Sequence, residues 1–318
     1  MKILITGSVA FDYLMTFPGL FKEHLLPEHL EKISLSFLVD GLVKRRGGIA
    51  PNIAYTLALL GGQAGIMATA GKDFLEYGKW LQKMGVDTSE IKIIEDKHTA
   101  TFFATTDQSN AQIASFYPGA MEDAATLSLN NLAEKPDLIL VSPNDPAAME
   151  KVIKECKQLG IDYAYDPSQQ IVRTDGETLL AGIQGAKAMF ANEYEFEMVK
   201  KKTGLNLESI LEYLDFLVIT LGPKGALVYH QEGDVTIEAF PTENIIDPTG
   251  GGDSFRGGFL TGYRLGLDWM TCGRLGSLAA TYCLENEGPQ GFHFSLEEFI
   301  DRYYQHYKND GKLDKLLA

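Results

Sequence analysis

The stretch DPTGGGDSFRGGF, residues 247–259, places three consecutive glycines directly before Asp253. Apolar residues recur at helical spacing from there, and this pattern predicts a helix over residues 253–265. The first N–H groups of a helix have no partner inside the helix and carry a partial positive charge. The backbone of Gly250, Gly251 and Gly252 is therefore well placed to hold an anion such as a phosphate.

Two known phosphate-binding motifs do not fit this stretch. A P-loop requires G-x-x-x-x-G-K-[ST], which occurs nowhere in the chain. The dinucleotide fingerprint G-x-G-x-x-G requires a third glycine where Phe255 stands. The sequence therefore supports neither a P-loop ATPase nor a nicotinamide-dependent dehydrogenase.

A carboxylate beside a cluster of N–H groups suits phosphoryl transfer to a hydroxyl. The transferred group builds up negative charge on its oxygens, while the attacking hydroxyl has to lose a proton. Asp253 could accept that proton next to the N–H groups that hold the phosphoryl group. In the alternative interpretation Asp253 only caps the helix and the glycines only turn the chain. Spacing alone leaves both interpretations open.

The composition is that of a globular protein without a membrane span. The 318 residues are 45% hydrophobic and 22% charged, and no segment approaches the roughly 18 uninterrupted apolar residues of a transmembrane helix. The net charge of −15 argues against a nucleic-acid or anionic-membrane surface, but not against a small anionic ligand. Cys156, Cys272 and Cys283 have no metal-site or disulfide spacing, which favours the cytoplasm.

Short β-rich runs alternate with helical patterns along most of the chain. This alternation predicts an α/β fold with a mostly parallel central sheet, covered by helices on both faces. The active site of such a sheet gathers at the carboxyl ends of its strands. We expect one domain over residues 1–318. The predicted strands span residues 3–6, 65–68, 137–141, 161–165, 186–190 and 216–220, and the predicted helices span residues 51–60, 74–84 and 146–159.

Two regions interrupt this alternation. Residues 13–46 lack a helical period, and residues 98–118 contain two alternating strands around the turn-forming residues 107–110. We predict that these regions form a small β-rich lid over the strand ends. An ordinary hairpin packed on the core is the alternative.

The sequence resembles the ribokinase-like family, also called the PfkB carbohydrate kinases, in five motifs that occur in the family's order. The C-terminal signature D-T-x-G-[AG]-G-D matches DPTGGGD and departs from it only at Pro248. The N-terminal signature, a Gly-Gly pair followed by an asparagine, matches GGIAPN at residues 47–52. Three shorter motifs match GSVAFD at 7–12, NEYE at 192–195 and TLGPKG at 220–225. The resemblance covers essentially the whole chain and implies a three-layer α/β/α kinase domain.

This resemblance implies roles for the matching residues. Asp253 would be the catalytic base beside the anion-binding glycines, and Asp12 would hold hydroxyls of the substrate sugar. Glu195 would act on magnesium through water. Each of the last two has an alternative: Asp12 could only stabilise a turn, and Glu195 could be a solvated carboxylate without a ligand. The remaining implied contacts are to ATP through Asn192, Thr220, Gly222 and Gly225, and to potassium, as a candidate activator, through Asp247 and Thr249.

Within the family, three further stretches resemble bacterial adenosine kinases. They are FPGLFKEHLLPEHLEKISLSFLVD at 17–40, AQIASFYPGAM at 111–121 and DPSQQ at 166–170. In that group Phe102 and Phe116 would sandwich the purine, and Gln169 or Gln170 would line its pocket. Core packing is the alternative for the two phenylalanines, and one of the two glutamines could simply face water. The ribose would be bound by Ser8, Asp12, Gly48 and Asn52, and Ser36 would reach the substrate of a neighbouring subunit, because those enzymes pair through their lids.

The resemblance therefore implies an ATP- and magnesium-dependent kinase for the 5′-hydroxyl of adenosine, serving purine salvage as a homodimer. Another kinase of the family, acting on ribose, a different nucleoside or a hexose, is one alternative. A catalytically silent nucleoside-binding protein on the same fold is another. Lys44, Arg45 and Arg46 precede the glycine pair, either as a solvated basic run or with one of them stabilising the transferred phosphoryl group.

Overall fold

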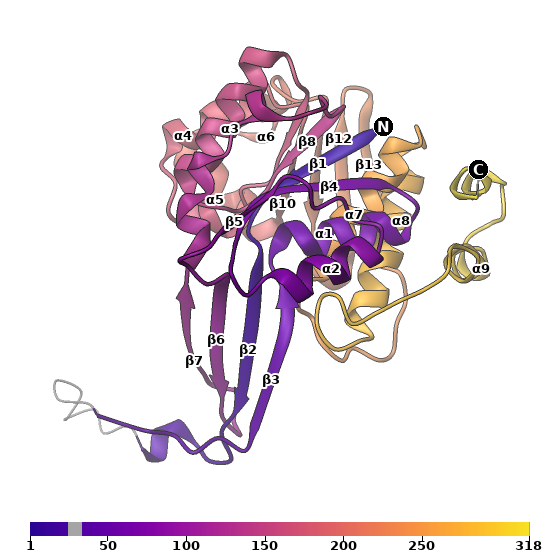
Figure 1. The fold of residues 1–318 in the computed structure, drawn as a ribbon. Helices are drawn as coiled ribbons and strands as arrows, with labels where there is room; N and C mark the ends of the chain where they lie inside the picture. The colour runs from indigo at the N-terminus through magenta and orange to yellow at the C-terminus, as the bar shows by residue number, and fades with distance from the viewer. Residues whose placement is uncertain (25–33, 318) are drawn as a thin grey trace.

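A large central sheet with helices on both faces dominates the computed structural model, which describes residues 1–24 and 34–317 (Figure 1). The strand order is β13-β12-β11-β10-β9-β8-β1-β4-β5. All neighbouring strands are parallel except at β11–β12 and β12–β13. The strands are β1 (Lys2–Thr6), β4 (Gln63–Gly71), β5 (Ile91–Ile94), β8 (Leu138–Val141), β9 (Tyr163–Tyr165), β10 (Ala188–Asn192), β11 (Phe216–Thr220), β12 (Ala226–His230) and β13 (Gly233–Ile237).

Alternate residues of the central strands enter two separate cores. Ile3 and Ile5 of β1 pack with residues of α1 and α7 on one face, while Leu4 packs with residues of α3 and α5 on the other. A strand buried on both faces has to be apolar throughout, which explains the uninterrupted apolar runs in the sequence. The helices are α1 (Ile49–Leu59), α2 (Leu75–Lys83), α3 (Pro146–Leu159), α4 (Gly176–Ile183), α5 (Glu193–Thr203), α6 (Leu207–Leu211), α7 (Gly251–Arg264), α8 (Trp269–Leu284) and α9 (Leu296–His306).

These elements confirm the predicted α/β fold with its mostly parallel sheet. Each predicted strand and helix is present, with ends displaced by a few residues at most. The hairpin of β12 and β13 was missed, because β13 lies at the edge of the sheet and exposes most of its side chains, so its sequence lacks the apolar run of a central strand.

A second, four-stranded sheet projects from the main body beyond α1 and α2 (Figure 1). Its order is β3-β2-β6-β7, formed by β2 (Ala10–Thr16), β3 (Gly41–Gly47), β6 (Ala100–Thr106) and β7 (Gln112–Tyr117). The β6–β7 hairpin belongs to this sheet, so the predicted lid is confirmed and the alternative of a core hairpin is wrong. Part of the stretch at 17–40, residues 25–33, lies outside the described residues.

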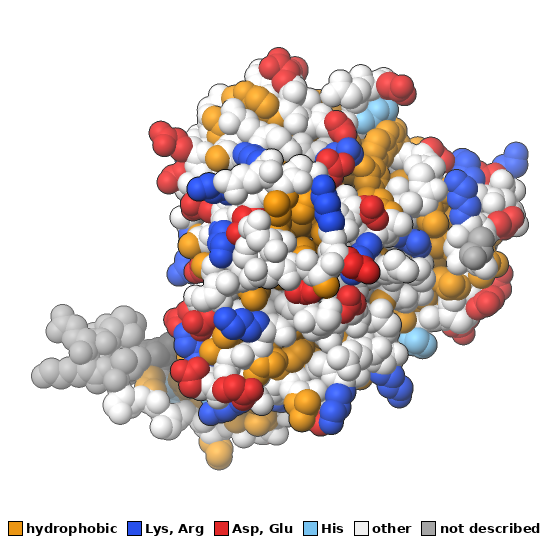
Figure 2. Space-filling view, turned by 45° about the horizontal axis from the view of Figure 1, so that its top comes forward, with side chains coloured by type: hydrophobic (Ala, Val, Ile, Leu, Met, Phe, Trp, Pro, Cys, Tyr) orange, Lys and Arg blue, Asp and Glu red, His pale blue; other side chains and the backbone are white. Residues whose placement is uncertain are grey.

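The surface and the cysteines add three observations. Acidic and basic side chains are interspersed over the face that Figure 2 shows. In residues 1–24 and 34–317 no helix has the length and apolar character needed to cross a bilayer. Cys156, Cys272 and Cys283 are buried and unpaired.

Candidate functional site

The N-terminus of α7 is formed by the glycine triplet. Gly250 is the N-cap with a φ of 83°, in the left-handed region, and a Cβ there would lie 2.3 Å from the Pro289 Cβ. No side chain caps this helix end. The interpretation of Asp253 as a helix cap is therefore wrong. The Gly251 N–H donates to the Pro248 carbonyl at 3.4 Å, and the N–H groups of Gly252 and Asp253 are left for a ligand.

Asp253 lies in the first turn of α7, and its Oδ2 accepts a 2.8 Å hydrogen bond from Asn52 Nδ2 at the start of α1. Burial raises the pKa of Asp253 to about 6, while the Arg256 guanidinium and the Asn52 hydrogen bond lower it and Asp166 and Glu195 raise it. Such a carboxyl group is ionised at neutral pH and is still basic enough to accept a proton.

A buried ion pair lies beside Asp253, and the sequence analysis missed it. Arg256 Nη2 lies 2.7 Å from Asp166 Oδ1 and 3.0 Å from Ser168 Oγ, and Asp166 is completely buried. An arginine three residues after Asp253, on the same side of α7, was the available signal. The guanidinium keeps positive charge next to the carboxylate of Asp253.

The predicted ribose-binding residues Ser8, Gly48 and Asn52 meet where β1 ends and α1 begins. Ser8 Oγ accepts a hydrogen bond from the N–H of Ile49 at 3.4 Å. Gly48 has a φ of 93°, and a Cβ there would lie 2.5 Å from the Ser8 carbonyl oxygen. Asn52, one turn into α1, connects this group to Asp253.

Asp12 lies on the lid, directly against the glycine pair. A Cβ on Gly47 would lie only 2.6 Å from Asp12 Oδ2, so a larger residue there would displace this carboxylate. Burial raises the pKa of Asp12 to about 6, with Arg45 lowering it and Asp247 raising it.

Four side chains form one row across the inner face of the lid. The strand registers pair Arg45 with Asp12, Asp12 with Phe102, and Phe102 with Phe116. Paired residues project from the same face of a sheet, so Phe102 and Phe116 both belong to one wall on the inner face of the lid. That the two rings enclose a purine stays a prediction.

The two predicted glutamines differ in their surroundings. Gln169 is exposed, whereas Gln170 is buried and its Nε2 donates to the Asn144 carbonyl at 2.8 Å. The residue before Asn144, Pro143, accepts a 2.8 Å hydrogen bond from the N–H of Ser8. Gln170 is therefore the one next to the ribose-binding residues.

A cavity of 590 Å³ lies on the other side of the glycine triplet. It brings together Thr220, Gly222 and Gly225 with Gly251 and Gly252. Its walls are mostly apolar and include residues that the sequence analysis did not name, because they belong to no motif: Phe240, Pro241, Thr242, Ala280, Thr281 and Leu284.

Asn192 and Glu195 form a reciprocal capping box at the start of α5. Each side chain accepts a 2.8 Å hydrogen bond from the other residue's N–H, and Asn192 is not among the residues that line the cavity. Burial raises the pKa of Glu195, with Arg256 lowering it and Asp166 raising it. Only Oε2 of Glu195 serves the capping box. A carboxylate with one oxygen left over, in the field of the same Arg256, fits the expected water-mediated contact with magnesium.

The Asp247 carboxylate does not fit the expected potassium site. Its Oδ2 accepts from Arg45 Nη1 at 2.5 Å and from the Gly288 N–H at 3.0 Å, and its Oδ1 accepts from the Thr249 N–H at 2.9 Å. Although burial opposes it, these hydrogen bonds hold the pKa of Asp247 below its ordinary value. Oδ2 has two donors and Oδ1 has one, and the Arg45 guanidinium already balances the charge of the carboxylate, so a cation bound through this side chain would have to compete with Arg45.

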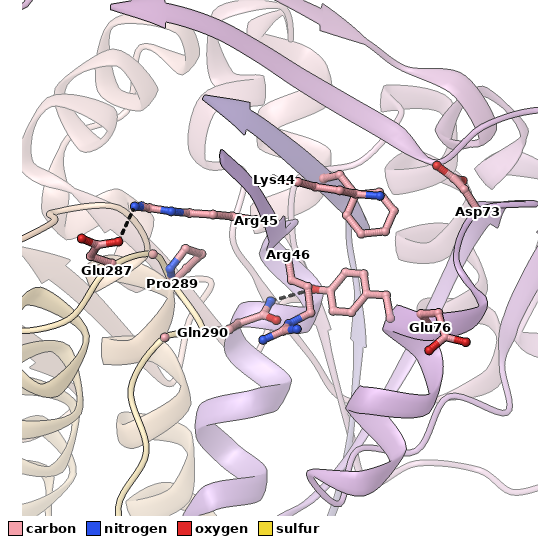
Figure 3. A pocket seen from close by; sticks show the side chains of 12 residues that line it. Lys44, Arg45, Arg46, Asp73, Glu76, Glu287, Pro289 and Gln290 are labelled. Carbon is pink, nitrogen blue, oxygen red and sulfur yellow. Dashed lines mark hydrogen bonds and ion pairs between the residues drawn. The ribbon is translucent and has the colours of Figure 1, made fainter. Parts of the chain in front are cut away.

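Lys44 and Arg46 line one cavity together with Arg45, and each lies against an aromatic ring (Figure 3). Lys44 Nζ lies 3.8 Å from the centre of the Phe11 ring, and the Arg46 guanidinium lies 3.9 Å from the centre of the Trp80 ring. Alternation along β3 leaves only Arg45 on the inner face, where it also pairs with Glu287 (Figure 3). Ser36, in the segment before β3, is exposed.

Comparison with known proteins agrees with this geometry. The profile of the pfkB family carbohydrate kinases matches residues 7–293. A nucleoside kinase of Methanocaldococcus jannaschii is 28% identical over 96% of this chain and 97% of its own length. The structure of Burkholderia thailandensis nucleoside kinase in complex with inosine is 37% identical, with a TM-score of 0.85 over 96% of this chain and 98% of that one. The same kinase in complex with ADP and inosine gives a TM-score of 0.84. The chain therefore belongs to the pfkB family of carbohydrate kinases.

Proposed function

We propose that the chain is an ATP-dependent adenosine kinase, which transfers the γ-phosphoryl group of ATP to the 5′-hydroxyl of adenosine. The observation that carries this proposal is the position of Asp253. It lies between the glycine N–H groups that border the cavity and Asn52 among the ribose-binding residues. A phosphoryl donor on one side and a hydroxyl acceptor on the other would meet at this carboxylate.

In this mechanism Asp253 takes the proton of the 5′-hydroxyl as its oxygen attacks the γ-phosphorus. The new O–P bond forms, the bond from the γ-phosphorus to the bridging oxygen breaks, and ADP leaves with that electron pair. The N–H groups of Gly252 and Asp253 stabilise the charge on the transferred group. Magnesium, held through water by Glu195, would neutralise the phosphates.

Gln170 supports adenosine as the nucleoside. The Asn144 carbonyl fixes its Nε2, and its Oε1 is buried without a hydrogen bond from any residue in 1–24 or 34–317. If substrate binding exposes this oxygen, the 6-amino group of adenine is a donor that would satisfy it, whereas the 6-oxygen of inosine would be repelled. Asp12 would accept hydrogen bonds from the ribose hydroxyls, and the Phe102–Phe116 wall would stack on the base.

We also propose that the enzyme is a cytoplasmic homodimer that pairs through its lid, with Ser36 reaching the partner's substrate. The unpaired cysteines support the compartment. Large apolar side chains are exposed on the lid, which supports the pairing. They are Leu35, Leu38, Leu42, Val43, Phe103, Ile113, Phe116 and Tyr117.

The test is ADP release from purified protein with ATP and magnesium, across adenosine, inosine, guanosine, cytidine and ribose. We expect kcat/KM for adenosine to exceed that for inosine about tenfold. Gln170→Leu should reduce this ratio, while Gln169→Leu, a change at the exposed neighbour, should keep it. A preference for ribose would overturn the nucleoside assignment. A preference for inosine would place Gln170 Oε1 at the protonated N1 and overturn the adenosine assignment.

A further inference from the structure

A chain of buried hydrogen bonds runs behind Asp253, through a residue that no motif includes. Gln290, in the loop between α8 and α9, donates from Nε2 to Asn52 Oδ1 at 2.7 Å and to the Tyr77 hydroxyl at 2.6 Å. The Tyr77 hydroxyl donates in turn to the Gly47 carbonyl at 2.9 Å. Figure 3 shows Gln290 bonded to this hydroxyl at the wall of a second cavity of 410 Å³.

This chain fixes which end of the Asn52 amide faces Asp253. An amide can present either its oxygen or its N–H groups, and only the N–H groups attract a carboxylate. Because Gln290 donates to the Asn52 oxygen, the Asn52 N–H groups point towards Asp253. Asn52, Gln290 and Tyr77 are each at least nine-tenths buried, so water does not replace these bonds.

The Gln290 side chain lowers the stability of the folded protein through one unsatisfied polar atom. Its Oε1 is buried and accepts no hydrogen bond from the part of the chain that the structure describes. Turning the amide over would not help, because Oε1 would then face the Asn52 oxygen and lose both donations. An apolar residue of similar size would avoid the unsatisfied atom, so the two donations of Nε2 account for the amide.

We propose that Gln290 is a positioning residue for phosphoryl transfer: it holds the Asn52 amide so that an N–H group, and not the oxygen, faces the Asp253 carboxylate. The inference rests on the proposed function, in which Asp253 is the base. Without Gln290 the Asn52 amide can rotate, and Asp253 loses the donor that favours its ionised form.

The expected consequence is a change in pH dependence. Asp253 also faces Arg256 of its own helix, Asp166 after β9, Glu195 of α5 and the buried Cys283 thiol of α8, whose pKa burial raises to about 12. Gln290 forms its hydrogen bonds with Asn52 and Tyr77 and not with any of these groups. Loss of the Asn52 hydrogen bond therefore raises the pKa of Asp253 and moves the acid limb of kcat/KM to higher pH.

The experiment compares wild type, Gln290→Leu, Asn52→Ala and the double variant in pH profiles of adenosine phosphorylation. We expect Gln290→Leu to lower kcat about tenfold or more and to move the acid limb upward. In the Asn52→Ala background the same change should cost less than about twofold, because Gln290 acts through Asn52. An unmoved acid limb, or the same loss in both backgrounds, would overturn the inference.

A second variant covers the case in which Gln290→Leu does not fold. Tyr77→Phe removes one contact of Gln290 without leaving a large cavity, and it should move the acid limb in the same direction. Tyr163→Phe is its matched control. It also removes a buried tyrosine hydroxyl that donates to a backbone carbonyl, here that of Gly182, far from the site. An acid limb of kcat/KM at the same pH in the two tyrosine variants would overturn the inference.

The inference and the proposed function fail in different ways. Near-normal turnover in Asp253→Asn removes the base and the inference with it. An inactive Asp253→Asn together with a wild-type acid limb in Gln290→Leu removes the inference alone.

Discussion

Asn52 Nδ2 donates a 2.8 Å hydrogen bond to Asp253 Oδ2, although the two residues are 201 positions apart in the chain. This contact joins the two signatures of the family in one site. Asn52 comes with the predicted ribose-binding residues Ser8 and Gly48, and Asp253 comes with the glycines of α7. The bond therefore joins the proposed acceptor side of the reaction to the proposed donor side.

Asp253→Asn should keep the affinity for adenosine within a few-fold and lower kcat by ~10²-fold or more, because the amide cannot accept the hydroxyl proton. Steady-state kinetics and equilibrium binding measure the two effects separately. Asp175→Asn, at the exposed N-cap of α4, is the matched change and should leave both unchanged. Turnover near that of the wild type would eliminate Asp253 as the base.

The same substitution should change the pH dependence of stability. The pKa of Asp253 in the folded protein is about 6, above its ordinary value of 3.8. The folded state therefore favours the protonated form of Asp253. Protonation of Asp253 stabilises the folded protein at low pH, and this contribution is lost as the pH rises through 6. Neutral asparagine avoids the loss, so Asp253→Asn should be more stable than wild type at pH 7.5 by ~1–3 kcal/mol and equal to it below pH ~4.

Urea denaturation at pH 7.5 and pH 3.5 measures the free energy of unfolding of both proteins. A difference of the same size at the two pH values would show that the ionisation of Asp253 is not its source.

Phe116→Ala should weaken adenosine binding about tenfold, because stacking on an aromatic ring contributes ~1–3 kcal/mol per base. The KM for ATP should stay within about twofold, since Phe116 does not line the cavity at α7. Phe103→Ala is the matched control: Phe103 is also partly exposed on the lid but projects from its outer face. Equal losses for adenosine and ATP, or from the two variants, would contradict a base-stacking role.

Wild-type turnover should be the same in potassium chloride and in tetramethylammonium chloride, because Arg45 and two backbone N–H groups occupy the Asp247 carboxylate. Arg45→Met removes the guanidinium and frees part of the carboxylate, so turnover of this variant should rise with potassium. Lys44→Met removes the same charge from the outer face of the lid and should respond like wild type. Stimulation of the wild type by potassium would show that the cation displaces Arg45.

Local patterns were sufficient to predict six strands of the main sheet, β1, β4, β8, β9, β10 and β11, but not β5, β12 or β13. Strands such as β1 and β11 are buried on both faces, so their apolar runs stand out whatever surrounds them. The turn at the glycine triplet was also predicted from the sequence, because a glycine turn followed by a helix involves only neighbouring residues. The hairpin of β12 and β13 at the edge of the sheet was not predicted, since a half-exposed strand is apolar on one face at most and lacks an apolar run.

Which residues make up the site could not be predicted in full from the sequence, because the site is held together by contacts between distant segments. Nothing near Gln290 in the chain marks it, and the position of Arg256 three residues after Asp253 does not reveal its partner. Their contacts are with Asn52 and Asp166, which approach only when the sheet and its helices pack. The same holds for the choice between Gln169 and Gln170, which burial decided. The register of the lid strands likewise put Phe102 and Phe116 on one wall.

The sequence by itself determined the α/β fold, the lid, the glycine turn that opens α7 and the family to which the chain belongs, because each follows from periodicity or from residues close together in the chain. Only the tertiary structure decided three contacts: Asp253 accepts a hydrogen bond from Asn52, Arg45 pairs with Asp247, and Gln290 donates to Asn52. The physical reason is that hydrogen bonds and ion pairs depend on ångström-scale geometry between segments up to 242 residues apart, and that geometry exists only once the cores are packed.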